Sequence, residues 1–168
     1  MSLTMHNSSV PIFVRMFANT LMWLDKAQAH AETRRFDPAN YLGMRLAPDM
    51  LPLTRQVQIA TDGAKGCVAR LAAQEVPKWE DNEASLDDLR ARLRRASDYV
   101  QTFSPQHFEG CESREIVLPM RTGDPLRFSG ESYLQHFVLP NLYFHSTATY
   151  ALLRHAGVEL GKKDFLGG

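Results

Sequence analysis

Cysteine is scarce in this sequence, with 2 residues among 168, and neither sign of charge prevails. Two thiols, Cys67 and Cys111, cannot build the disulfide framework that holds many small secreted domains together. Lys and Arg number 19 against 19 Asp and Glu, so no net charge attracts nucleic acid or anionic lipid. The hydrophobic content of 44% excludes a disordered chain and is sufficient for one folded domain, which we expect to span residues 1–168.

Long hydrophobic runs, targeting signals and common catalytic motifs are also missing. Residues 1–9 are polar and lack the charged and apolar regions of a signal peptide. The most apolar window, residues 10–24, is interrupted by Arg15, Asn19 and Thr20 and is too short to span a bilayer. There is no nucleophile elbow, no phosphate-binding glycine loop and no paired-cysteine metal motif. We therefore expect a cytoplasmic protein without a membrane or nucleic-acid partner.

Four segments carry apolar residues at helical spacing, at residues 9–36, 52–76, 85–104 and 129–156. Ser85 is a good N-cap for the third segment, and Gly157 is a good terminator for the fourth. Pro140 falls inside the fourth segment, where the helix should kink or restart. Helices of this length with short links predict an all-α fold, an antiparallel four-helix bundle. We expect seven apolar side chains to be buried together: Phe13, Phe17, Leu21, Val57, Leu89, Leu93 and Val100.

The spacing changes between the third and fourth helices. Residues 114–119 and 126–128 favour strands, and Arg121-Thr122-Gly123-Asp124 between them has the composition of a turn. This pattern predicts a small β-hairpin that covers one end of the bundle. In the second helix, Gly63 and Gly66 each cost about 1 kcal/mol relative to alanine, so we expect a neighbouring helix or a ligand to pack closely against them.

Four arginines, Arg90, Arg92, Arg94 and Arg95, lie close together in the third helix. They follow an acidic stretch and have no aromatic residues between them, unlike many nucleic-acid-binding patches. We therefore expect them to form a solvent-exposed face of the helix.

The fourth helix contains the best candidates for a functional site. Asn141 and His145 are four residues apart, which puts them on one face, as two ligands of a metal site require. A carboxamide oxygen is a poor zinc ligand, so the alternative is a buried core histidine beside an Asn that bonds backbone groups freed by Pro140. His136 lies about half a turn away and joins this face only if the kink rotates it.

Several segments resemble an uncharacterised bacterial family grouped with the DinB-like (YfiT-like) four-helix bundles. In the last helix they are YLQHF at 133–137, PNLYFH at 140–145 and LLRHAGV at 152–158. Elsewhere they are RLAPDM at 45–50, RQVQIA at 55–60 and GKKDFLG at 161–167. The resemblance extends from about Ser8 to Gly167 and implies the same bundle that the periodicity predicts.

The resemblance also implies where a metal site would lie. Many members of the superfamily bind zinc or nickel through three histidines, and their positions correspond here to Gln58, Asn141 and His145. Only His145 is an imidazole, so we expect no resident cofactor and a cluster in which these three side chains hydrogen-bond one another. We expect this cluster at the bottom of a pocket that opens near residues 45–52, with Asp49 or Tyr41 at its rim and His136 as a further candidate.

Three functions follow from this resemblance and from the residues. The first is a DinB-like protein of unknown activity that binds a small ligand in a polar pocket. The second is a metal-dependent transferase or hydrolase, similar to thiol S-transferases of the superfamily, in which the metal activates a thiol. The third is a dimeric interaction protein without an active site. A homodimer is expected because Tyr143, Phe144 and Tyr150 exceed what one helix seam needs, unless the kink rotates these rings into the core.

Overall fold

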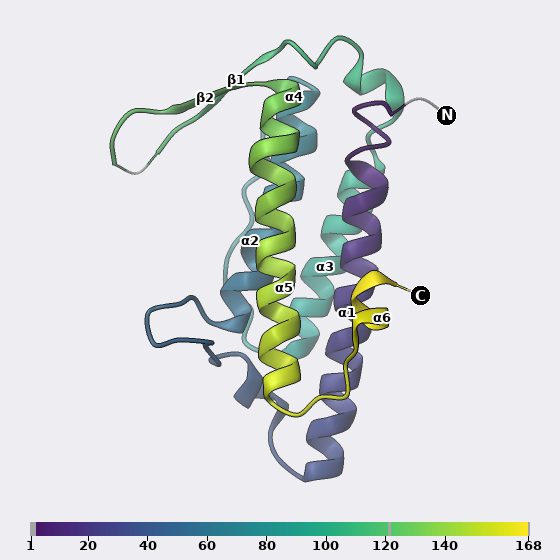
Figure 1. Cartoon of the computed structure of the whole chain (residues 1–168), viewed down its shortest axis with the longest axis vertical. Coiled ribbons are helices and arrows are strands. Elements are labelled where there is room, and N and C mark those ends of the chain that lie inside the picture. Colours follow the sequence, from purple (N-terminus) through teal and green to yellow (C-terminus); the bar gives the residue numbers. More distant parts are fainter. Residues whose placement is uncertain (1–2, 121, 168) are drawn as a thin grey trace.

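Four long helices run alongside one another in the computed structural model, which describes residues 3–120 and 122–167 (Figure 1). They are α1 (Val10–Arg34), α2 (Leu53–Leu71), α3 (Leu86–Gln101) and α5 (Leu139–His155). Strands β1 (Glu115–Leu118) and β2 (Leu126–Ser129) form an antiparallel hairpin that projects from one end of the bundle. The predicted all-α bundle with a small hairpin is thus confirmed; Arg121, in the predicted turn, lies outside the described residues.

The direction of each helix follows from contacts near its ends. His6, just before α1, bonds the carbonyl oxygen of Phe103, just after α3, over 3.1 Å. Further along α1, the carbonyl oxygen of Leu24 accepts a hydrogen bond from Arg90, near the start of α3. The helices α1 and α3 are therefore antiparallel neighbours.

The pair α2 and α5 is antiparallel in the same way, because Gln56 contacts His145 while Arg70, further along α2, contacts Tyr133. Figure 1 shows that α2 and α3 run in the same direction. The residues between them, 72–85, must return along the bundle before α3 can begin, and we call them the strap. The link between α2 and α3 is therefore a crossover along the bundle and not a short turn.

Shorter elements complete the chain: η1 (Pro38–Tyr41), η2 (Pro105–Phe108), α4 (Gly130–Ser132), η3 (Tyr133–Val138) and α6 (Lys162–Leu166). The interruption expected at Pro140 takes the form of a π-helical turn, η3, which ends just before this proline. Proline lacks the N–H that would continue a regular ladder, and a π turn lets the helix continue past the defect. The cap at the start of this helix is Ser129, whose hydroxyl oxygen accepts from the backbone N–H of Ser132.

The C-terminal helix α6 packs on the middle of α1. The ring of Phe165 stacks on Trp23 with centroids 5.5 Å apart, and the Trp23 indole N–H donates to the carbonyl oxygen of Asp164. Lys26 pairs with the Asp164 carboxylate over 2.7 Å, and Asn19 donates to the Phe165 carbonyl oxygen. This segment therefore covers the face of α1 that the other long helices leave open.

The interior matches the apolar pattern of the sequence. Of the seven side chains expected in the core, only Leu21 is half-buried, and the other six are buried. Ser85 caps α3 as predicted, because its hydroxyl oxygen accepts from the Asp88 backbone N–H over 3.0 Å. Among the described residues, no helix combines the length and hydrophobicity needed to cross a membrane.

The arginines of α3 correct one expectation. Arg94 and Arg95 are exposed, but the side chains of Arg90 and Arg92 are buried, so the predicted solvent-exposed face is wrong for these two. Arg90 pairs with Asp25 of α1, and Arg92 pairs with carboxylates of α2 and the strap. Buried guanidinium groups are tolerated because acidic partners surround them.

The glycines give a second correction. No atom beyond its own helix backbone and chain neighbours lies within 4 Å of the position that a Gly63 Cβ would take, so close packing does not explain this glycine. A Cβ at Gly66 would meet only the end of the flexible Arg70 side chain. By contrast, a Cβ at Gly130 would lie 1.9 Å from the carbonyl oxygen of Cys111, where the chain enters α4. Gly130 is therefore the glycine that packing requires.

We expect alanine to have opposite effects on stability at Gly63 and at Gly130. Gly63→Ala should stabilise the protein by up to about 1 kcal/mol, because alanine has the higher helix propensity and finds open space. Gly130→Ala should destabilise it by about 1–3 kcal/mol, because the backbone at Cys111 must move. Urea unfolding of both variants measures this difference, and equal stabilities would contradict the packing at Gly130.

Candidate functional site

His145 and Gln56 form a buried polar pair between α5 and α2. The two helices are antiparallel neighbours, and the Nδ1 atom of His145 lies 2.7 Å from Oε1 of Gln56. The His145 side chain is 8% exposed and Gln56 is 2% exposed, so both polar groups need a partner inside the protein. They supply one for each other.

The hydrogen-bond network assigns the proton on His145. The Nε2 of Gln56 donates to the carbonyl oxygen of Leu51 over 2.9 Å, which fixes the orientation of this amide. Oε1 of Gln56 therefore faces His145 and accepts from Nδ1–H. Burial lowers the pKa of His145, so the ring is neutral at pH 7 and Nε2 keeps its lone pair. These two hydrogen bonds, from Gln56 to Leu51 and from His145 to Gln56, therefore leave Nε2 of His145 without a proton.

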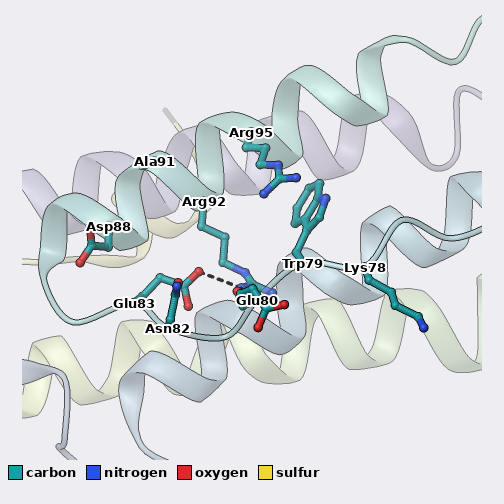
Figure 2. Close-up of a pocket in the computed structure, with 9 residues that line it drawn as sticks. All are labelled: Lys78, Trp79, Glu80, Asn82, Glu83, Asp88, Ala91, Arg92 and Arg95. Atoms are coloured by element: carbon teal, nitrogen blue, oxygen red, sulfur yellow. Dashed lines mark hydrogen bonds and ion pairs between the residues drawn. The ribbon is translucent and has the colours of Figure 1, made fainter.

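Gln58 does not take the place that the superfamily pattern gave it. Its Nε2 donates to Glu83 of the strap over 2.6 Å, and its Oε1 accepts from Arg55 over 2.7 Å. Positions 56 and 58 differ by about 200° around a helix, so both cannot face α5. Glu83 in turn accepts from Arg92, as the dashed line in Figure 2 shows. The amide that faces His145 is Gln56, and the expected contact with Gln58 is wrong.

The other predicted residues are distributed over the bundle. Asn141 is half-buried, and its side chain donates to the carbonyl oxygen of Phe137 over 2.7 Å, just after the π turn. His136 and Asp49 are exposed. Tyr41 is buried in η1, and its hydroxyl lies 2.6 Å from Nδ1 of His30 on α1. The expected hydrogen bonds among Gln58, Asn141 and His145 are therefore not formed, and His145 bonds Gln56 instead.

The donor set does not fit zinc or nickel. In a three-histidine site each ring would direct a nitrogen at the metal, but the amides at the two other positions bond Phe137 and Glu83. Across residues 3–120 and 122–167, no group of three or more His, Cys, Asp and Glu side chains is placed to hold a metal ion. The chemistry available at His145 is that of a neutral base or hydrogen-bond acceptor.

An apolar groove lies on α5 next to His145 in sequence, and its lining includes neither His145 nor Gln56. It has a volume of about 410 Å³ and lies between the connection before α2 and the outer face of α5. Phe144 and Ala148, which flank His145 in sequence and one turn along α5, line it, and Leu46 and Met50 form the opposite wall. The Phe144 ring meets the His145 ring edge to face, with centroids 5.2 Å apart. The groove is the concave surface next to the predicted site, near residues 45–52.

The contributor from α2 is Gln56, two residues before Gln58, the position that the resemblance indicates. Gln56 sits beside the apolar stripe of Leu53, Val57 and Ala60 on α2, whereas Gln58 lies further from it. Because this stripe faces the neighbouring helices, a glutamine at its edge is the one that reaches a partner across the helix interface. The position of each glutamine relative to the apolar stripe of α2 therefore distinguishes Gln56 from Gln58.

Comparison with known proteins gives a family and a close structural relative. The model of a domain of unknown function, DUF1993, matches residues 5–166. A crystal structure of a DinB family member protein from Shewanella denitrificans is similar with a TM-score of 0.90 and 41% sequence identity. The similarity covers 97% of this chain and 92% of that chain. A comparison with curated proteins gives no match.

A double-mutant cycle tests the pair. His145→Ala and Gln56→Ala should each destabilise the protein by about 1–3 kcal/mol, because each leaves a buried polar group without its partner. Together they should cost less than the sum, with a coupling of about 0.5–3 kcal/mol in urea unfolding.

Gln58→Ala provides the matched control, since it removes a glutamine from the same helix. Combined with His145→Ala it should be additive within about 0.5 kcal/mol. A coupling of His145 to Gln58 that equals its coupling to Gln56 would refute the assigned contact.

Proposed function

The chain belongs to the DUF1993 family of DinB-like proteins, and on that basis we propose that it binds a small, mainly apolar ligand in the groove beside His145. The observation that carries this proposal is the neutral Nε2 of His145, which keeps a lone pair because Nδ1–H is committed to Gln56. Ligand sites of this kind combine an apolar lining with a few oriented polar groups.

The lining of the groove supports an apolar ligand. Leu46, Met50, Ala148 and Ala151 contribute only hydrocarbon or thioether surface, and Phe144 contributes an aromatic face. A volume of about 410 Å³ lies within the range of small-molecule sites. A ligand with one hydrogen-bond donor would satisfy His145 while its apolar part replaces water along the groove.

The transferase or hydrolase alternative has less support. That chemistry depends on a metal that lowers the pKa of a bound thiol, and the side chains at the three ligand positions are two amides and one histidine. The amides are occupied by other partners within the protein. We therefore propose a binding role and assign no reaction.

A pair of probes that differ only in a donor tests this proposal. Phenol should bind about 2–10-fold more tightly than its methyl ether, anisole, which corresponds to a net hydrogen bond of about 0.5–1.5 kcal/mol. The preference should persist at pH 6.5 and decline only at lower pH, because burial lowers the pKa of His145 below its ordinary value of about 6.5 and protonation removes the accepting lone pair. Calorimetric titration measures both affinities.

His145→Leu should abolish the preference for phenol and retain binding of anisole. His136→Leu is the matched control, because His136 is exposed and should leave the preference intact. Equal affinities of the wild type for phenol and anisole would overturn the proposed role of His145.

A second candidate function, homodimerisation, is favoured by exposed aromatic rings on the face of α5 that lines the groove. Phe144 is 58% exposed and Tyr143 is 41% exposed, while Tyr150 packs against Trp23 and Phe165. Tyr143 also borders a second groove, which Phe165 and Leu166 line. A contiguous apolar face of this kind is typical of protein interfaces, and a protruding ring beside a groove can be self-complementary in a two-fold dimer.

Phe144→Asp tests the dimer. At micromolar concentration the wild type should scatter light as a dimer, and the variant should scatter as the 19.0 kDa chain, because a charge cannot be buried there without a partner. Val117→Asp, at an exposed apolar position of the hairpin, should leave the dimer intact. A wild type that is monomeric at this concentration would remove the second candidate.

The free cysteines and the paired arginines support proposals about where the protein is located and which other partners it has. Cys67 and Cys111 are free and buried, which supports a reducing compartment such as the cytoplasm. The inward-facing arginines Arg90 and Arg92 are committed to carboxylates of this chain, so they offer little to nucleic acid or anionic lipid. We therefore propose neither nucleic acid nor a membrane as a partner.

A further inference from the structure

A second cleft lies between the strap and α3, away from the His145 groove. It has a volume of about 600 Å³, and Trp79 and Arg92 are at its centre in Figure 2. The strap contributes residues 78–80, 82 and 83 to its lining, and α3 contributes Asp88, Ala91, Arg92 and Arg95. None of these residues belongs to the site proposed above.

Arg92 makes the floor of this cleft rigid. Its Nε donates to the Thr61 hydroxyl over 2.8 Å, and its Nη1 donates to Glu83 over 2.8 Å and to the carbonyl oxygen of Glu80 over 3.1 Å. Its Nη2 lies 2.9 Å from Asp62, at an angle that gives an ion pair without a hydrogen bond. These contacts attach the strap and pair Arg92 with the carboxylates of Glu83 and Asp62, so these groups are not available to a ligand.

Trp79 is held in place by neighbours from both helices. The Nζ of Lys65, on α2, lies 4.4 Å from the ring centroid, and the guanidinium carbon of Arg95, on α3, lies 4.3 Å from it. Tyr99 meets the ring edge to face. The indole is only half-buried, so it forms an ordered aromatic wall of the cleft.

Four charged side chains of the lining remain without an ion-pair partner in the described part of the chain. Two are cations, Lys78 and Arg95, and two are carboxylates, Glu80 and Asp88. In Figure 2 both cations lie toward the Trp79 end, whereas Asp88 lies at the opposite end. Asp88 and Arg95 are separated by two turns of α3, or about 10 Å.

We propose that this cleft binds an extended zwitterion, a linear molecule with a carboxylate at one end and an ammonium group at the other. The carboxylate pairs with Arg95 and Lys78, and the ammonium group pairs with Glu80 or Asp88. The apolar chain between them passes the edge of Trp79, because Lys65 and Arg95 cover the faces of the ring. A lining with two free charges of each sign favours neither a simple anion nor a simple cation. A fixed floor lets the ligand bind without reorganising the protein.

The fluorescence of Trp79 reports binding, because the other tryptophan, Trp23, is fully buried under α6. The probe is 6-aminohexanoate, compared with hexanoate, which lacks the ammonium group, and hexylamine, which lacks the carboxylate. We expect 6-aminohexanoate to bind about fivefold more tightly than either, which corresponds to about 1 kcal/mol for one ion pair. Trp79→Phe should remove the signal.

Variants assign each end of the ligand. Arg95→Gln should weaken 6-aminohexanoate and hexanoate about fivefold and leave hexylamine unchanged. Glu80→Gln or Asp88→Asn, whichever removes the partner of the ammonium group, should weaken 6-aminohexanoate and hexylamine and leave hexanoate unchanged. Arg94→Gln is the matched control, because this neighbouring arginine is exposed outside the cleft and should change none of the affinities.

Three results would overturn the proposal. The first is an affinity for hexanoate or hexylamine that equals the affinity for 6-aminohexanoate. The second is an equal loss of affinity in Arg94→Gln and Arg95→Gln. The third is the absence of a saturable fluorescence change up to about 10 mM, where binding is weaker than about 3 kcal/mol. Lys78→Gln, which should resemble Arg95→Gln in its selectivity, provides a second variant if Arg95→Gln alters the fold.

Discussion

A guanidinium group taken out of water needs acidic partners and hydrogen-bond acceptors around it, since its desolvation costs several kcal/mol. Arg92 meets this need with the hydroxyl of Thr61 on α2 and with two groups of the strap. These are the backbone carbonyl oxygen of Glu80 and the carboxylate of Glu83. One side chain thereby connects three segments that are distant in the chain. Because α2 and α3 run in the same direction, the strap must lie along the bundle, and Arg92 attaches it there. The orientation of Trp79 depends on this attachment.

Most of the bundle could be predicted from the sequence because helix formation and core burial follow a local apolar period. Leu89, Leu93 and Val100 are buried at the positions that their spacing predicts, and Ser85 caps its helix. The burial of Arg92 could not be predicted in this way. Its partners come from α2 and the strap, and only the folded chain brings them together. The crossover of the strap was missed for the same reason.

The candidate site was predicted in part. His145 was identified from its spacing and from the family resemblance, and it does lie buried between two helices. The choice between Gln56 and Gln58 depended on the rotation of α2 about its axis, which a short motif does not determine. Asn141 was matched by position, but the π turn before Pro140 changes the local backbone, and its amide bonds Phe137. Tyr41 belongs instead to a pair with His30 on α1.

The packing of α6 on α1 has a consequence for the order in which the chain matures. A ribosome synthesises α1 before the other long helices and α6 after them, and folding during synthesis proceeds with what has already emerged. Until residues 164 and 165 arrive, the Trp23 indole N–H and the Asn19 amide lack their protein acceptors. This side of α1 therefore stays uncovered until α6 has emerged and docked on it.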